Sequence, residues 1–589
     1  MSVTAIFNIA QSALFTHSRS LDVVAHNIAN VNTPGFSRQN ALLVTNDPVT
    51  SGGLMLGQGV NADQVLRSTN EFVEQQLLSQ NADLASFEEM EKFARVLESI
   101  FSENQDTSLS TRLSDFWNLW QDVANNPAGL SERRALCENT VMLCDQFNAL
   151  RSDLSQLRRD ITNALSSGVD HVNALTQEIA ELNAQIVRIE ASEPANDLRD
   201  QRDQKLNALG EYLDIKTFEQ ENGAVDVITV KGCILVQRNA YYELRTGGLS
   251  GEKVEWLGSD GAGVDLSAHI DTGRIGGWLE MRDEKIKQYQ LELDELSRAL
   301  IWSVNAQHSQ GVGSDLFAPG TVLSGDYKTS GDLSDLAFGD QIQFTGNAFK
   351  LWIEDRSDPA NPVISAVDID LSGLNSGSGL SDLAAAVNTQ IAAAGLSGVS
   401  ADGSGAVLTL TADGSHAFGF SDDTSGMLAT LGLNTFFSGS DADTITLNPL
   451  LENEALVAAG LIDSATGAYY DGDNTNALAM AELQHQSLSI PRWACNRRTG
   501  DTSMTTSTTI ETYYHTLVGS MGTHSAGITR NRQFKEAMCT QIGALRDGIS
   551  AVSLDEEMAD MIQFQHAYTA AGKLITTADE MLETVLGLK

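Results

Sequence analysis

Both ends of the chain carry an apolar residue at almost every seventh position. Near the N-terminus one series consists of Phe7, Leu14, Leu21 and Ile28, and a second series three residues away includes Val24. Near the C-terminus the two series are Leu554, Met561, Tyr568, Ile575, Leu582 and Glu557, Phe564, Ala571, Ala578, Val585. This spacing places apolar side chains on one narrow stripe of an α-helix.

A helix with such a narrow apolar stripe is marginal in water, because its stability comes mainly from packing that stripe. Each end could dock on the protein's own core, but the matching stripes favour pairing of the terminal helices with each other and with neighbouring copies. The residues predicted to carry this self-assembly are Phe7, Leu14, Leu21, Val24, Ile28, Leu554, Met558, Met561, Phe564, Tyr568, Ile575, Leu582 and Val585. Ser553 and Glu556 form an S-x-x-E capping box, which predicts where the C-terminal helix begins.

The periodicity changes along the middle of the chain. From Asp115 to about Leu213 apolar residues recur every three or four positions, which predicts a long helical rod. Its apolar stripe runs from Phe147 through Leu154, Ile161 and Leu165 to Ile189, and its spacing slips once, between Ile161 and Leu165. Residues 280–307 and 505–550 are predicted to be further helices. Short alternating runs such as 224–230 and 406–411 predict strands and hairpins, with one helix at 380–395. The fold class is therefore multidomain α+β, with a terminal α-helical coiled coil, a helical bundle and β-rich middle domains.

With 589 residues the chain is too long for one ordinary core. We expect a terminal coiled-coil assembly domain (1–34 and 552–589) and a helical rod or bundle domain (35–213 and 485–551). A β-rich outer domain (214–314 and 446–484) and an acidic β-rich insert with one helix (315–445) should complete the chain.

The charge balance limits the partners. The 78 acidic residues against 37 Lys and Arg give a net charge of −41, which repels phosphate backbones and anionic lipid headgroups. We expect no nucleic-acid partner and no membrane partner, since no segment approaches the ~20 apolar residues that cross a bilayer. The N-terminus does not resemble a cleaved secretory signal, so the chain should stay in the cytoplasm or leave by a route that reads no such signal.

No segment of the sequence assembles an active site, and we predict no enzyme, cofactor or metal site. The five cysteines form no C-x-x-C pair. Residues 57–62 match a loose G-x-G-x-x-A without a surrounding βαβ unit. Asp471, Asp473, Thr475 and Glu482 have the spacing of a calcium loop but lack its central glycine, so capping of a helix by Asp473 or Asn474 is preferred. Acidic pairs such as Asp368 and Asp370 leave a secreted glycan-binding or hydrolytic protein as an alternative.

Residues 25–39, Ala-His-Asn-Ile-Ala-Asn-Val-Asn-Thr-Pro-Gly-Phe-Ser-Arg-Gln, closely resemble the signature of bacterial flagellar rod, hook and hook-associated proteins. The matching signature residues are Asn27, Asn30, Asn32, Pro34, Gly35 and Phe36. The segment Gly57–Val60, followed by Arg67, Phe72 and Leu77, looks like the stretch after this signature. Asn196–Asp203 resembles a motif of hook-associated proteins of the first type, and residues 550–557 resemble their C-terminal signature with Ala551 and Ser553 in place of the more usual Gly and Asn.

This resemblance implies a structural subunit that joins hook to filament at the hook-filament junction. It further implies an extracellular place on the flagellum, reached through the flagellar type III pathway after a transient stay in the cytoplasm. The implied partners are other copies of the chain in a helical or ring assembly, the hook protein, the neighbouring junction protein or the filament, and an export chaperone at the C-terminal helix. Another axial protein, such as a hook subunit, is the nearer alternative.

Overall fold

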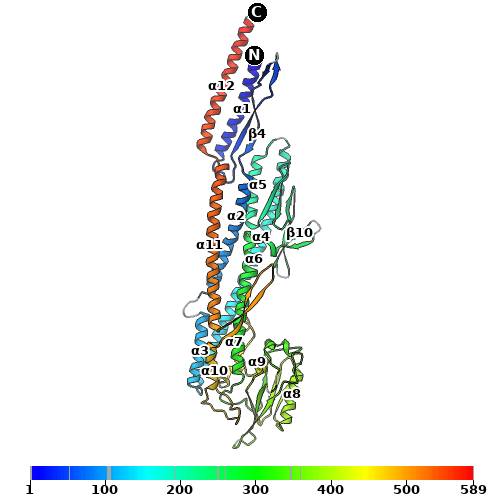
Figure 1. Ribbon diagram of the computed structural model, residues 1–589, viewed down its shortest axis with the longest axis vertical. Helices are drawn as coiled ribbons and strands as arrows, with labels where there is room; N and C mark the ends of the chain where they lie inside the picture. The colour runs from blue at the N-terminus through cyan, green and yellow to red at the C-terminus, as the bar shows by residue number, and fades with distance from the viewer. Residues whose placement is uncertain are drawn as a thin grey trace. The chain divides into compact units, whose positions relative to one another are not determined.

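The computed structural model describes residues 3–51, 54–102, 108–191, 193–248, 251–258, 261–344, 346, 348–358 and 360–587. Two compact units are formed (Figure 1). One contains Met1–Phe93, Asp160–Arg282 and Ala526–Lys589, and the other contains Ala94–Arg159 and Asp283–Ser525. The division of the chain into four domains stays a prediction.

Twelve α-helices occur in the described residues. They are α1 (Val3–Ala29), α2 (Glu71–Ile100), α3 (Leu109–Asn125), α4 (Leu130–Ile189), α5 (Asn196–Tyr212), α6 (Gly273–Glu280), α7 (Lys287–His308), α8 (Leu380–Ala393), α9 (Met427–Leu431), α10 (Thr475–Glu482), α11 (Ile510–Ser550) and α12 (Leu554–Gly587). A π-helical turn, Met281–Ile286, joins α6 to α7. None of the helices in the described part of the chain combines the length and apolarity that a membrane span requires.

The strands form small antiparallel sheets. In the first unit these are β1 (Gln39–Thr45) with β4 (Val60–Arg67), β2 (Val49–Ser51) with β3 (Leu54–Leu56), the sheet β5 (Ile215–Glu219), β6 (Val225–Thr229), β7 (Ile234–Gln237), β8 (Ala240–Tyr241), and the sheet β9 (Leu244–Gly247), β10 (Lys253–Leu257), β11 (Gly263–Asp265). In the second unit they are β12 (Val322–Ser324), β16 (Thr409–Ala412), β15 (Val399–Asp402), then β14 (Val363–Ile369), β13 (Phe349–Asp355), β17 (His416–Ser421), and the pairs β18 (Phe437–Ser438) with β19 (Thr446–Leu447) and β20 (Leu488–Ala494) with β21 (Thr502–Thr508).

The predicted α+β fold class and the long helical region are confirmed. Helix α4 runs for 60 residues, and the apolar stripe predicted along it is buried at Phe147, Leu154 and Ile161. The stripe stays buried at Leu165, across the position where its three-and-four spacing slips, and becomes exposed only at Ile189. A single change of phase is therefore absorbed without interrupting the helix.

A buried histidine lies in the core of the second unit. His308 is 0% exposed, and its Nδ1 donates to the carbonyl of Asn434 at 2.8 Å while its Nε2 accepts from the N–H of Ala458 at 3.0 Å. Both ring nitrogens are thus used by one neutral tautomer. Burial lowers the pKa of His308 to about 4.

Several acidic side chains of the insert accept hydrogen bonds from the backbone of turns. The carboxylates of Asp370, Asp402 and Asp413 each accept from a backbone N–H two residues further on, at 2.8–2.9 Å. These hydrogen bonds lower the pKa of Asp370 and Asp402, because they favour the charged form. Helix α8 ends as predicted, with Gly395 at a φ of +71° and a hydrogen bond from the N–H of Leu396 to the carbonyl of Ile391.

Three local predictions need correction. Residues 505–508, predicted to begin a helix, belong to strand β21, and α11 starts at Ile510. The run Thr502–Thr508 is rich in threonine and has no apolar stripe, so β propensity decides its structure. Residues 406–408 precede β16 instead of lying in it. At the end of α4, Ile189 is 42% exposed rather than packed.

Candidate assembly interface at the terminal helix pair

Helices α1 and α12 lie side by side and run antiparallel (Figure 1). The ring of His17 is 6.2 Å from that of Phe564, and Asn27 is hydrogen bonded to Glu557, so the numbers rise along one helix as they fall along the other. Ala10 and Ala571 are both buried, and from the heptad spacing beyond the His17 contact we infer that they lie opposite each other. The two terminal stripes therefore meet within one chain.

The pairing covers only part of the predicted apolar surface. Val24 is buried, and the half-buried residues are Leu14, Leu21, Ile28, Met561, Phe564 and Ile575. Exposed are Phe7, Leu554, Met558, Tyr568 and Leu582, at 40%, 46%, 56%, 43% and 39%. The side chain of Val585 lies outside the described residues.

Asn27, the first signature asparagine, ties the two chain ends together. Its Nδ2 donates to the carbonyl of Gln39 at 2.8 Å and to Oε2 of Glu557 at 3.0 Å, and its Oδ1 accepts from the N–H of Gln39 at 3.0 Å. Asn27 and Glu557 are each 1% exposed. Only a side chain with both a donor and an acceptor at this reach satisfies the Gln39 backbone and the carboxylate together.

Arg38 adds the charge that the buried carboxylate requires. Its Nε donates to Oε1 of Glu557 at 2.7 Å, and its other nitrogens reach Glu556 at 2.6 Å and Asp560 at 3.5 Å. The N–H of Arg38 also donates to the carbonyl of Ser550, the last residue of α11. Arg38 therefore fixes the point where α11 ends and α12 begins.

The rest of the signature builds the turn that follows α1. Asn30 donates from Nδ2 to the carbonyl of His26 at 3.0 Å and accepts from the hydroxyl of Thr33 at 3.1 Å. Gly35 has a φ of +76°, and an added Cβ would come within 2.6 Å of Gln204, whose Nε2 donates to the carbonyl of Pro34. Phe36 packs its ring edge on the ring of His26, whereas Asn32 is exposed. Glycine is required at this position by both conformation and space.

The Asn196–Asp203 motif, at the start of α5, receives the signature turn. Asp200 accepts from the N–H of Ser37 at 3.1 Å and from Arg67 at 2.7 Å, and Asp203 accepts from the same guanidinium at 2.7 Å. Asp197 accepts from Nε2 of Gln39 at 2.9 Å. Burial raises the pKa of Asp200, against the opposing effect of its donors. For Arg67, the two carboxylates outweigh burial and raise the pKa.

The segment after the signature packs on α1 through β4. The hydroxyl of Thr16 donates to the carbonyl of Val60 at 2.9 Å. Gly59 has a φ of +91°, and a Cβ there would collide with the Ser12 hydroxyl. Leu77 is buried and Phe72 is 75% exposed.

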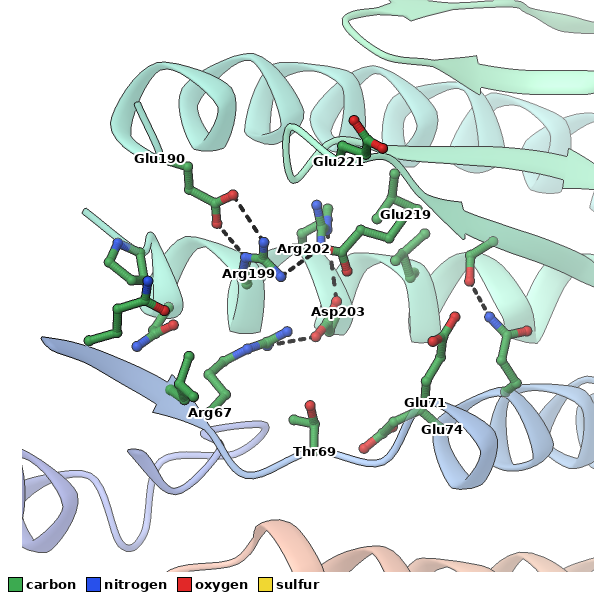
Figure 2. Close-up of a pocket in the computed structure, with 18 of the residues that line it drawn as sticks. Arg67, Thr69, Glu71, Glu74, Glu190, Arg199, Arg202, Asp203, Glu219 and Glu221 are labelled. Carbon is green, nitrogen blue, oxygen red and sulfur yellow. Dashed lines mark hydrogen bonds and ion pairs between the residues drawn. The ribbon is translucent and has the colours of Figure 1, made fainter. Parts of the chain in front are cut away.

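A polar cavity of about 1000 Å³ lies beside this joint (Figure 2). Arg199 is ion-paired with Glu190 and, at 2.7 Å, with Glu219, and the hydrogen bond to Glu190 is the main cause that raises the pKa of Arg199. Arg202 is buried and donates to the carbonyl of Gly223 at 2.6 Å. These arginines thus link α5 to the end of α4 and to β5. Within the residues that the structure describes, no group of three or more His, Cys, Asp or Glu is placed to hold a metal ion.

Sequence reasoning named the motifs but missed the contacts between them. Arg38, Gln39 and Glu557 were given no role, and Asp197, Asp200 and Asp203 were recognised only as a string. One signal was available, because Glu557 is the single charged residue in the apolar series of the C-terminal helix. A charge at such a position indicates a specific partner.

Comparisons with known proteins match three parts of the chain to families of flagellar proteins. Residues 94–322 match the family "Flagellar hook-associated protein FlgK helical domain", residues 548–588 match "Flagellar basal body rod FlgEFG protein C-terminal", and residues 7–36 match "Flagella basal body rod protein". Flagellar hook-associated protein 1 of Escherichia coli (strain K12) is 25% identical over the full length of both chains. The protein of the same name from Bacillus subtilis (strain 168) is also 25% identical, over 98% of this chain and 96% of its own.

Over its whole length, this chain is similar to flagellar hook-associated protein 1. Its fold resembles the solved structure "The structure of the flagellar hook junction protein FlgK from Burkholderia pseudomallei", with a TM-score of 0.52 and 19% identity. That likeness covers 81% of this chain and all of the solved one. The two matched segments 7–36 and 548–588 contact each other where α1 ends and α12 begins.

Proposed function

We propose that this chain is a structural subunit of the bacterial flagellum that joins hook to filament at the hook-filament junction. The observation that carries the proposal is the meeting of three separate segments at one joint. The signature turn (30–39), the Asn196–Asp203 motif and the start of α12 contact one another through Asn27, Arg38 and Asp200. A joint built this way sets the direction of the terminal helix pair relative to α5.

Self-assembly would use the sides of the helix pair that remain open. Phe15 on α1 is 69% exposed, and Met558 and Ile562 on α12 are 56% and 53% exposed. Residues 561–572 contain no Asp, Glu, Lys or Arg, although much of this segment faces solvent. Covering these side chains against neighbouring copies would release about 25 cal/mol for each Å² of apolar surface removed from water. The same surface would meet the hook protein on one side and the next junction protein or the filament on the other.

An exposed apolar helix needs protection before delivery. We infer that an export chaperone covers α12 during a transient cytoplasmic stay, and that the chain then leaves through the flagellar type III pathway. The terminal helices would be frayed in the free chain and order on assembly, which offsets part of the energy gained from burial. The work of the protein in this scheme is mechanical, with no catalytic step.

Localisation in isolated flagella tests the proposal. An antibody against the acidic insert (315–445) should label one narrow zone between hook and filament, because a junction subunit is present only there. A cell that lacks the chain should make hooks without attached filaments, and the wild-type chain should restore them. Labelling along the whole hook would support a hook subunit instead, and contradict the proposal.

A further inference from the structure

The base of α12 turns its less apolar side toward α1. Leu554, Met558 and Ile562 follow one another along one side of the helix, and about half of each side chain is exposed. The side that faces α1 carries Glu557, which is 1% exposed. Burial of these three side chains would favour another rotation at the start of the helix, so hydrophobicity alone does not explain why Glu557 is buried there.

Packing farther along the helix pair covers its large side chains only in part. The buried residues of α12 are Glu557, Ala571 and Ala578, whereas Met561, Phe564 and Ile575 are half-buried. The ring of Phe564 lies 6.2 Å from that of His17. This packing supports the observed rotation of α12, but the charged residue at its start needs a separate explanation.

The contacts of Glu557 are specific. Its two oxygens accept from Arg38 at 2.7 Å and from Asn27 at 3.0 Å. Both donors are held by the backbone, since Asn27 is bonded to Gln39 and the N–H of Arg38 to Ser550. A turn of α12 that buried Leu554 would withdraw the carboxylate from both donors and place the Asn27 amide against an apolar side chain. An unpaired buried polar group is strongly unfavourable.

We propose that Asn27, Arg38 and Glu557 form an orientation key that selects which face of α12 meets α1. The key keeps Leu554, Met558 and Ile562 outward, on the surface that the proposed function assigns to neighbouring copies. Its role is to specify geometry rather than to add net stability. Buried polar contacts that fix the alignment of paired helices are the best-attested use of such groups.

Disulfide trapping can measure the rotation. Ala571 and Thr569 lie about 160° apart around α12, at about 100° per residue. Ala571→Cys paired with Ala10→Cys reports the observed face, and Thr569→Cys paired with Ala10→Cys reports the opposite one. In the full-length chain recovered from isolated flagella, oxidation should link 10 to 571 about tenfold more efficiently than 10 to 569. The secreted protein should show the same preference, weakened by fraying of the terminal helices. The double variant Asn27→Leu, Glu557→Leu should bring the two yields to within about threefold.

Two matched controls separate the key from general packing. Glu557→Gln keeps the size of the side chain and one acceptor oxygen but places an NH2 against the second donor, so it should weaken the preference for position 571 without abolishing it. Thr16→Val removes the buried hydrogen bond to Val60 but leaves the key intact, and it should retain the full preference. The proposal is overturned if the double leucine variant still links only to position 571, or links to neither position. A chain that keeps the wild-type ratio but labels the whole hook would contradict the proposed function and leave the key standing.

Discussion

Replacing Arg38 by alanine removes the charge that faces the buried Glu557 carboxylate. Of the three carboxylates that Arg38 reaches, Glu556 and Asp560 have side chains 63% and 42% exposed, and such pairs contribute little because water screens them. The side chain of Glu557 is 1% exposed, so nearly the whole effect falls on this ion pair. Breaking a buried pair by removing one partner costs about 3–5 kcal/mol.

Hydrogen exchange on isolated flagella measures this loss. Amides of α12 between residues 557 and 578 should exchange about a hundredfold to a few thousandfold faster in Arg38→Ala, since each 1.4 kcal/mol is a factor of ten. The double variant Arg38→Leu, Glu557→Leu should recover most of the protection, because no unpaired charge remains.

A control comes from Arg134, which pairs with Glu138 at 2.9 Å with both side chains about two-thirds exposed. Arg134→Ala should leave the exchange of α12 unchanged. If Arg38→Ala also changed the exchange rates by less than about threefold, the buried ion pair would not hold the helix pair together, and the reasoning would be refuted.

Three further predictions concern the seam, the core of the second unit and the signature turn. Ile575→Asp should prevent incorporation at the junction while the circular dichroism of the purified chain stays unchanged; normal incorporation would count against the assembly surface. The pKa of His308 is lower in the folded than in the unfolded chain, so its contribution of about 3 kcal/mol to the free energy of unfolding is present above pH 6.5 and lost as the pH falls toward 4. Urea unfolding as a function of pH should detect this loss, and His308→Gln should abolish the pH dependence. Gly35→Ala should lower the free energy of unfolding by more than about 1 kcal/mol, because Gly35 has a positive φ. Gly57→Ala should have little effect, because the space around its Cβ is open. Equal effects of the two substitutions would contradict the requirement for a positive φ.

The long helices could be predicted because burial leaves a regular trace in the sequence. The stripe from Phe147 to Ile161 and the heptads of α1 and α12 follow directly from the helical period, and the structure buries or half-buries most of them. The turn after α1 was equally clear, since Thr33-Pro34-Gly35 combines a helix stop with a residue that tolerates a positive φ.

Two kinds of feature could not be predicted. Periodicity does not say which of several apolar faces is buried, and so Leu554 and Met558, predicted for the assembly seam, lie outside the intrachain pair. Their role toward neighbouring copies stays a prediction. A contact between segments far apart in sequence, such as Ser37 with Asp200, leaves no trace in either segment alone. The charge of Glu557 indicates that it has a partner but not that the partner is Asn27.

The β20–β21 hairpin was missed for another reason. Its second strand, Thr502–Thr508, is mostly polar and comes directly before the long helix α11 in the sequence. A search for apolar stripes therefore assigned part of the strand to that helix. The β-branched threonines were the signal that could have identified the strand.

The central claim is that α1 and α12 are ordered mainly by neighbouring copies in the assembly. Hydrogen exchange on the wild-type chain, compared between the free monomer and isolated flagella, tests it most directly. We predict weak protection of residues 3–29 and 554–584 in the monomer and strong protection after assembly, with the amides of α4 protected in both. Full protection of both terminal helices in the monomer would contradict the claim.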